Sequence, residues 1–123
     1  KLKNMHANCR YAYYLGMKPT GVYSKISVQP GDMSFDDMKA HKGLYVVNFS
    51  DFQMDSLSGF FGGEIRLAYY NDGEKIVPVT GGSVNGTIID AQKDFEFSKE
   101  TQETSTFAGP KAILLKDISV AGK

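Results

Sequence analysis

The segment YYNDGEKIVPVTGG, residues 69–82, constrains the fold of this chain more than any other stretch. Two β-forming runs flank three residues that tolerate the positive φ angles of a short hairpin loop: Asn71, Asp72 and Gly73. Pro78 stands inside the returning run, and a proline cannot donate a hydrogen bond to a neighbouring strand. We therefore predict an antiparallel hairpin whose second strand lies at a sheet edge and ends at a glycine pair, residues 81–82.

Other segments carry strand and loop signals. In the first hairpin strand, Ile65, Leu67 and Tyr69 alternate with the residues between them, so we expect them to share one face. The run LYVVNF, residues 44–49, predicts a strand buried on both faces. Alternation also predicts strands over residues 22–28 and 111–122. The two remaining stretches are expected to be irregular or exposed connections, one with three glycines and one rich in threonine: residues 50–63 and 96–110.

Two short helices are predicted. Ser34 is a good N-cap for a helix over residues 35–42, because its hydroxyl can accept a hydrogen bond from the first turn. Gly43 would follow this helix as its C′ residue, and Phe35 and Met38 would be its buried pair. A second helix is expected over residues 87–95, where apolar residues keep a helical spacing.

These elements indicate one α+β domain, 1–123, dominated by antiparallel strands bent into a barrel-like or sandwich sheet with one or two short helices packed on it. A chain of 123 residues is long enough to bury one hydrophobic core. Its 14 basic and 14 acidic residues balance, so we expect no nucleic acid and no membrane as a partner. No apolar run is long enough to cross a bilayer, and no segment has the pattern of a signal peptide.

Cys9 is the only cysteine, which excludes an internal disulfide and suits a reducing, cytoplasmic compartment. His6 and Cys9 could supply two metal ligands, but a four-ligand zinc site needs two more, and His41 is the only other histidine. Cys9 and His41 could also pair as nucleophile and base, but no activating helix start or glycine elbow accompanies the cysteine. We therefore predict no catalytic residue and no metal ligand in this chain.

Four segments follow one another in a characteristic order: RYAYYLGMKPTG from residue 10, GLYVVNFSDFQMDSLSG from residue 43, NDGEKIVPVTGGSVNGTIIDAQKDF from residue 71 and KAILLKDISVAGK from residue 111. Their order and spacing resemble the C-terminal part of the TldD/PmbA family, the putative modulators of DNA gyrase. The resemblance implies that the chain is the C-terminal part of a longer protein. No residue of these four segments supports an action on gyrase.

The resemblance implies a cytoplasmic peptidase system that degrades unfolded peptides and trims a microcin precursor. In the family, a metal-bearing subunit binds zinc through an H-E-x-x-x-H helix and a cysteine near the chain end, and the zinc activates water. This chain has neither that motif nor a cysteine in residues 98–110. The resemblance therefore implies a metal-free, PmbA-like chain that is inactive alone, takes no cofactor and has a homo- or hetero-dimer partner of the same family.

Within this resemblance, the segment DSLSGFFGG could line a peptide-sized cavity, because glycine lets an extended peptide approach the backbone closely. The candidate cavity residues are Ser58, Gly59, Phe60, Phe61 and Gly62. Turn geometry alone also accounts for these glycines, and that explanation stays open. A different function stays open too: a free-standing β-rich interaction domain with no peptidase connection, whose aromatic residues contact a partner, namely Tyr11, Tyr13, Tyr14, Phe60 and Phe61.

Overall fold

The computed structural model describes residues 25–122, which are mostly antiparallel β-structure with two short helices. This confirms the expected α+β class, although the sheets do not close into a barrel. The elements are, in chain order, β1 Ile26–Ser27, α1 Phe35–Ala40, β2 Gly43–Met54, β3 Phe60–Asn71, β4 Ile76–Val79, β5 Ser83–Thr87, α2 Ile88–Ala91, β6 Glu96–Phe97, β7 Thr101–Glu103, β8 Phe107–Pro110, β9 Ile113–Leu114 and β10 Ser119–Ala121.

The main sheet has the strand order β10–β5–β3–β2, and β4 pairs with β3 beside β5. Its central strand, β3, pairs along its whole length with β2 on one side. On the other side its first half pairs with β5 and its second half with β4. Pro78 of β4 lies opposite Tyr69 of β3, and in the described part of the chain β4 pairs with β3 alone, as an edge strand should.

The glycine pair after β4 is a bend within the sheet. Gly81 and Gly82 have φ angles of 77° and 76°, which residues with a side chain rarely adopt. The Gly81 N–H donates to the Ile65 carbonyl and the Ile65 N–H donates to the Gly82 carbonyl, both at 2.9 Å. The bend therefore keeps hydrogen bonding to β3 unbroken while the chain passes from β4 into β5.

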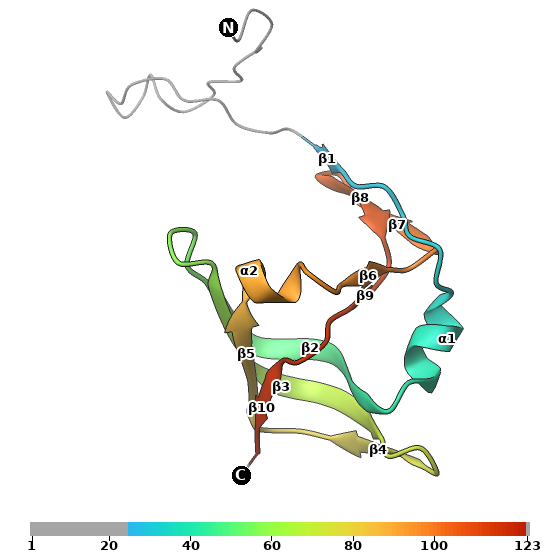
Figure 1. The fold of residues 1–123 in the computed structure, drawn as a ribbon, viewed down its shortest axis with the longest axis vertical. Coiled ribbons are helices and arrows are strands. Elements are labelled where there is room, and N and C mark those ends of the chain that lie inside the picture. Colours follow the sequence, from blue (N-terminus) through green and yellow to red (C-terminus); the bar gives the residue numbers. More distant parts are fainter. Residues whose placement is uncertain (1–24, 123) are drawn as a thin grey trace, which may run out of the picture.

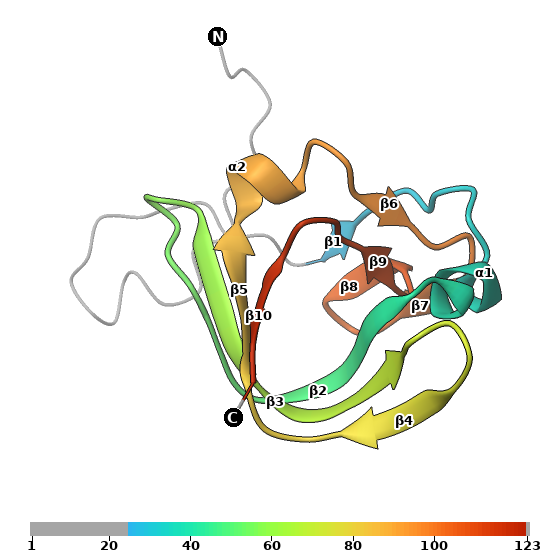
Figure 2. The same cartoon turned by 60° about the horizontal axis from the view of Figure 1, so that its bottom comes forward.

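The ladder between β2 and β3 is interrupted by three register shifts, which leave one extra residue each at Val47, Ser50 and Arg66. Such bulges bend a sheet, and Figures 1 and 2 show the main sheet curving around the helices and smaller sheets. They also change the expected face pattern of β3, because Ile65 and Ala68 are buried whereas Leu67 and Tyr69 are exposed.

The hydrophobic core lies on the concave face of the main sheet. Ile65, Ala68 and Val84 are buried there, and partly buried neighbours pack against them: Leu44, Val46, Phe49, Val79 and Ile118. The expectation that residues 44–49 are buried on both faces was wrong, since Tyr45 and Val47 are 37% and 47% exposed. In the described residues the convex face of this sheet is therefore largely open, although the ring of Phe35 from α1 packs edge-on against Tyr45, with 5.6 Å between the ring centroids.

The C-terminal third of the chain corrects two predictions. Residues 96–110 are ordered as β6, β7 and β8, and β8 pairs in parallel with β1, Ile26 lying opposite Phe107. Residues 111–122 form two strands, β9 and β10, which pair with different partners. Asp117, with φ 56°, lies between them. Pairing with distant strands orders residues 96–110 and divides residues 111–122 into two strands, and local propensity does not contain this information.

The helices match their sequence signals in part. Ser34 caps α1, and its hydroxyl accepts a hydrogen bond from the Asp37 N–H at 3.1 Å. Met38 is buried and Phe35 half-buried. Gly43 is the first residue of β2, and His41 is the C-cap, so the predicted C′ role was wrong. The second helix, α2, is shorter than the predicted 87–95: β5 continues to Thr87, and the helix already ends at Ala91, with Gln92 as its C-cap.

Candidate functional site

The second half of β2 and the first half of β3 form an arm whose tip projects from the body of the molecule (Figure 1), and β5 pairs with β3 along the arm. In the arm, Met54 lies opposite Phe61 and Asp51 lies opposite Glu64. The expectation that residues 50–63 are irregular was wrong except at the turn, residues 55–59. Gly59 lies in that turn, whereas Gly62 and Gly63 lie within strand β3, where one partner strand on each side supplies hydrogen bonds.

The tip of the arm, residues 55–59, is a tight turn held by side-chain and backbone hydrogen bonds. The Asp55 N–H donates to the Phe60 carbonyl and the Gly59 N–H donates to the Asp55 carbonyl, both at 2.8 Å. The Asp55 carboxylate accepts from the Leu57 N–H at 2.9 Å and from the Ser58 hydroxyl at 2.6 Å. Gly59 has φ 72°, and its carbonyl accepts from the Ile88 N–H at 2.8 Å, which ties the tip to α2.

These contacts also set the charge of the tip. The Ser58 hydroxyl and the Leu57 N–H stabilise the ionised carboxylate, so they hold the pKa of Asp55 below its usual value. Asp55 is exposed and therefore carries a full negative charge at neutral pH. The tip is thus a fixed, anionic turn, and the polar groups that hold it leave its apolar side chains free.

The five predicted cavity residues all lie on the arm, but they do not share one surface: Ser58, Gly59, Phe60, Phe61 and Gly62. Phe60 is 46% exposed, and its ring leans over Gly62, where an added Cβ would lie 3.3 Å from Cζ. Phe61 is buried and stacks on Phe52, the ring centroids lying 6.3 Å apart. Phe61 therefore belongs to the core, and of these two predicted rings only Phe60 is available to a partner.

Sequence reasoning missed the most exposed apolar group in the described chain. We define the arm-tip patch as the exposed apolar side chains of the arm and of the helix beside it: Phe52, Met54, Leu57, Phe60, Ile88 and Ile89. Leu57, at the turn, is 97% exposed. Phe52 and Met54 lie two residues apart on one face of β2, a strand signal that would have revealed the arm.

Apart from the arm-tip patch, a polar depression of about 400 Å³ lies between β5, α2 and residues 116–119. Its charges are largely paired within the chain. The Asp90 carboxylate accepts from Lys93 Nζ and from the Thr87 hydroxyl, both at 2.8 Å. The Lys93 ammonium and the Thr87 hydroxyl hold the pKa of Asp90 below its usual value, and the Asp90 carboxylate raises the pKa of Lys93. We assign no chemistry to this depression.

Of the residues considered for metal binding, only His41 lies in the part of the chain that the structure describes. Among residues 25–122, no group of three His, Cys, Asp or Glu side chains is placed to hold a metal ion. His41 ends α1, whereas His6, Cys9 and the three tyrosines at 11, 13 and 14 lie outside the described residues, so predictions about them stay predictions. In the described range, no helix is both long enough and apolar enough to span a bilayer.

Comparison with known protein families gives a match that covers nearly the whole chain. Residues 1–122 match the family model described as the PmbA/TldA metallopeptidase C-terminal domain. No curated protein and no solved structure shows significant similarity to the chain.

Proposed function

The chain belongs to the PmbA/TldA metallopeptidase family, as its C-terminal domain, and on this premise we propose that it shapes a peptide-binding cavity and a subunit interface. In this proposal the arm-tip patch lines the cavity and contacts unfolded peptide. The hydrolytic zinc is held outside this chain. The chain would therefore act as a binding and positioning element within a cytoplasmic metallopeptidase assembly.

The observation that carries the proposal is that an ordered, hydrogen-bonded turn holds an apolar side chain in solvent at the arm tip. Leu57 is almost fully exposed, yet the turn that presents it is held by hydrogen bonds from Asp55, Ser58 and Gly59. Large exposed apolar side chains cost solubility, and contiguous groups of them usually mark interaction sites. An ordered turn loses little conformational entropy on binding, so this geometry favours contact with an apolar ligand.

The convex face of the main sheet supports the interface part of the proposal. Tyr45 lies opposite Tyr69, and Tyr69 lies opposite Pro78, so the three form a row across β2, β3 and β4. Leu67 and Ile76, which are 36% and 59% exposed, extend this row. An antiparallel sheet that stands free in water usually carries polar residues on its outer face. This face instead suits a partner subunit of the same family.

The composition of the chain supports the metal-free branch. Its one cysteine is Cys9, and residues 96–110 form ordered strands without a cysteine ligand. The donors in the described residues do not fit a zinc site, so no step of peptide hydrolysis is assigned to this chain. The alternative is a free-standing interaction domain whose partner surface is made by Tyr11, Tyr13, Tyr14, Phe60 and Phe61. It does not account for a family match over residues 1–122.

The test is peptide binding by the purified chain. Fluorescence anisotropy with a labelled unfolded peptide is compared for the unchanged chain, Leu57→Ser and Phe60→Ser. We expect each substitution to weaken binding at least fivefold while the unfolding temperature stays the same, because both side chains are exposed. Ile76→Ser, a matched exposed position on the convex face, should leave peptide binding unchanged. Equal affinity of all four proteins would refute the peptide-contact role of the arm tip.

A further inference from the structure

The apolar arm-tip patch is accompanied by a local excess of negative charge. Residues 43–65 contain three acidic side chains and no lysine, arginine or histidine: Asp51, Asp55 and Glu64. The first basic residue after this stretch is Arg66, beyond the last residue of β3 that pairs with β5. In the adjoining helix and its last turn, Lys93 pairs with Asp90, which leaves Asp94 as a further acidic neighbour.

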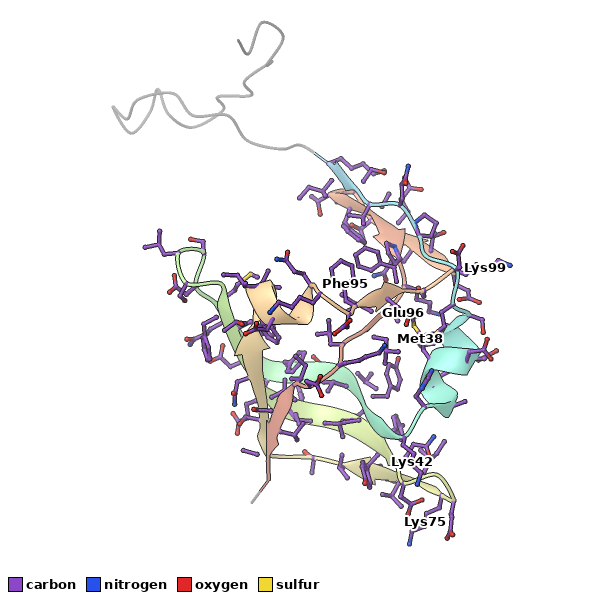
Figure 3. The ribbon with its side chains drawn as sticks, viewed as in Figure 1. Met38, Lys42, Lys75, Phe95, Glu96 and Lys99 are labelled. Carbon is purple, nitrogen blue, oxygen red and sulfur yellow. The ribbon has the colours of Figure 1, made fainter. Side chains whose placement is uncertain are left out.

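The chain as a whole has no net charge, so this acidic excess is balanced elsewhere. Lys42 and Lys75 lie together beside the β3–β4 loop, at the end of the sheet opposite to the arm (Figure 3). The Lys42 side chain lies over Gly73 of that loop. The β3–β4 loop also carries Asp72 and Glu74, so the feature that distinguishes the arm is the absence of basic side chains over residues 43–65.

The patch is large enough to matter for binding. With Leu57 97% exposed and Phe52, Met54 and Ile89 each more than half exposed, its six side chains present on the order of 600 Å² of surface, at the upper end of what a monomer exposes. Phe52 and Met54 lie on the concave face of the arm and Phe60 on the convex face, so the apolar surface wraps around the arm. Asp51 and Glu64 lie opposite each other on the convex face, and Gly62 separates Glu64 from Phe60 along that face of β3.

We infer that the arm tip selects extended peptide segments that carry both apolar and positively charged side chains. This inference rests on the proposed function and names the class of peptide that the cavity would take. Apolar side chains of the peptide would cover Leu57 and Phe60, while lysine or arginine side chains would reach Asp51, Asp55 or Glu64. Complementary charge around an apolar centre contributes to specificity and to the rate of association.

The same features argue against other occupants. An anionic lipid surface or a nucleic acid would be repelled by the carboxylates around the patch. A second copy of the chain docking patch to patch would bring the two acidic arms together, which like-charge repulsion opposes. A basic, apolar peptide meets neither obstacle.

The experiment compares two labelled peptides that share one apolar sequence and carry either three lysines or three glutamates. Binding to the full 123-residue chain is measured by fluorescence anisotropy at about 50 mM and about 500 mM salt, since exposed charges are screened at high ionic strength. We expect the basic peptide to bind at least tenfold more tightly at low salt, with the difference falling to less than threefold at high salt. Equal affinity of the two peptides at low salt would overturn the charge selection and leave the apolar contact standing. Absence of binding by both peptides would overturn the proposed function itself.

A pair of matched variants locates the selecting charges. Asp51→Asn/Glu64→Gln removes two carboxylates from the arm and keeps side chains that can accept the same hydrogen bonds. Asp32→Asn/Glu74→Gln removes two exposed carboxylates away from the arm, so its net charge changes equally. We expect the arm variant to lose most of the preference for the basic peptide and the control to keep it. Equal loss in both would show that net charge, and not the arm, causes the preference.

Discussion

The Asp55 carboxylate accepts a 2.6 Å hydrogen bond from the hydroxyl of Ser58, three residues further along the chain. This bond closes the turn that presents Leu57, and it is the strongest single influence on the ionisation of Asp55. The conformation of the arm tip and its charge therefore depend on the same pair of residues.

Titration of Asp55 tests this dependence. In the folded chain its pKa lies below that of an unfolded chain, so the turn is stabilised above the unfolded value and loses this stabilisation as pH falls through the folded value. We expect Ser58→Ala to raise the pKa of Asp55 toward its ordinary value, as followed by NMR of the side-chain carboxyl carbon. An unchanged pKa in Ser58→Ala would contradict the role of the hydroxyl, and Ser56→Ala, a neighbouring exposed serine, is the control.

The buried hydroxyl of Ser98 gives a second prediction. Ser98 is fully buried, and its hydroxyl donates to the Glu100 carbonyl at 2.8 Å and accepts from the Ala112 N–H at 3.0 Å. Ser98→Ala leaves the Ala112 N–H without its partner, whereas the Glu100 carbonyl still accepts from the Lys111 N–H at 2.9 Å. We expect the orphaned N–H to cost about 1–3 kcal/mol in urea-induced unfolding. Ser119→Ala, at an exposed position, should change the free energy of unfolding by less than about 0.5 kcal/mol. A Ser98→Ala protein as stable as the control would show that water replaces the lost hydroxyl.

Two adjacent glycines of the arm should respond differently to the same change. At Gly63 an added Cβ would lie 2.6 Å from Cδ1 of Phe49 and 2.9 Å from Cδ2 of Phe52. Gly63→Ala is therefore expected to destabilise the chain by about 1–3 kcal/mol through overpacking. Gly62→Ala meets only the ring of Phe60 at 3.3 Å, and that exposed ring can move. We expect Gly62→Ala to change the free energy of unfolding by less than about 1 kcal/mol. If thermal unfolding showed Gly62→Ala to be the more destabilising of the two, the positions described for the aromatic rings of the arm would be contradicted.

The bend between β4 and β5 offers a further matched pair of substitutions. Gly81 and Gly82 share a positive φ, which costs a residue with a Cβ about 1–2 kcal/mol. An added Cβ at Gly81 meets nothing within 4 Å, whereas at Gly82 it would collide with the carbonyl oxygen of Ala121. We expect Gly82→Ala to be clearly the more destabilising and to increase hydrogen exchange in β10. Equal effects of the two substitutions would indicate that β10 adapts without cost.

Local signals in the sequence predicted the elements that depend on a few neighbouring residues. Ser34 marks the start of α1 because its side chain completes the first turn, and the loop before β4 closes on the carboxylate of Asp72, which accepts from the N–H groups of Glu74 and Lys75. Pro78 indicated an edge strand because its missing N–H is a property of the residue itself.

The failures concern elements that distant segments create. Residues 50–63 lacked a strand signal because of their glycines, and sequence spacing does not reveal that Gly63 makes room for the rings of Phe49 and Phe52. The polar stretch around Gln102 and Glu103 is a strand because β8 pairs with it and β1 pairs with β8. The arm-tip patch was missed for the same reason. The exposure of Leu57 follows from its position at the turn of the arm, and the arm exists only because β2 and β3 pair.

The three bulges between β2 and β3 have a consequence for how length can vary in this family. Each inserts one unpaired residue, at Val47, Ser50 or Arg66, while the pairs on both sides keep their partners. Loss of one such residue would restore a regular ladder without turning the following side chains to the opposite face. Related chains could therefore lack a residue at one of these positions and keep the same core, and their main sheet would be less curved.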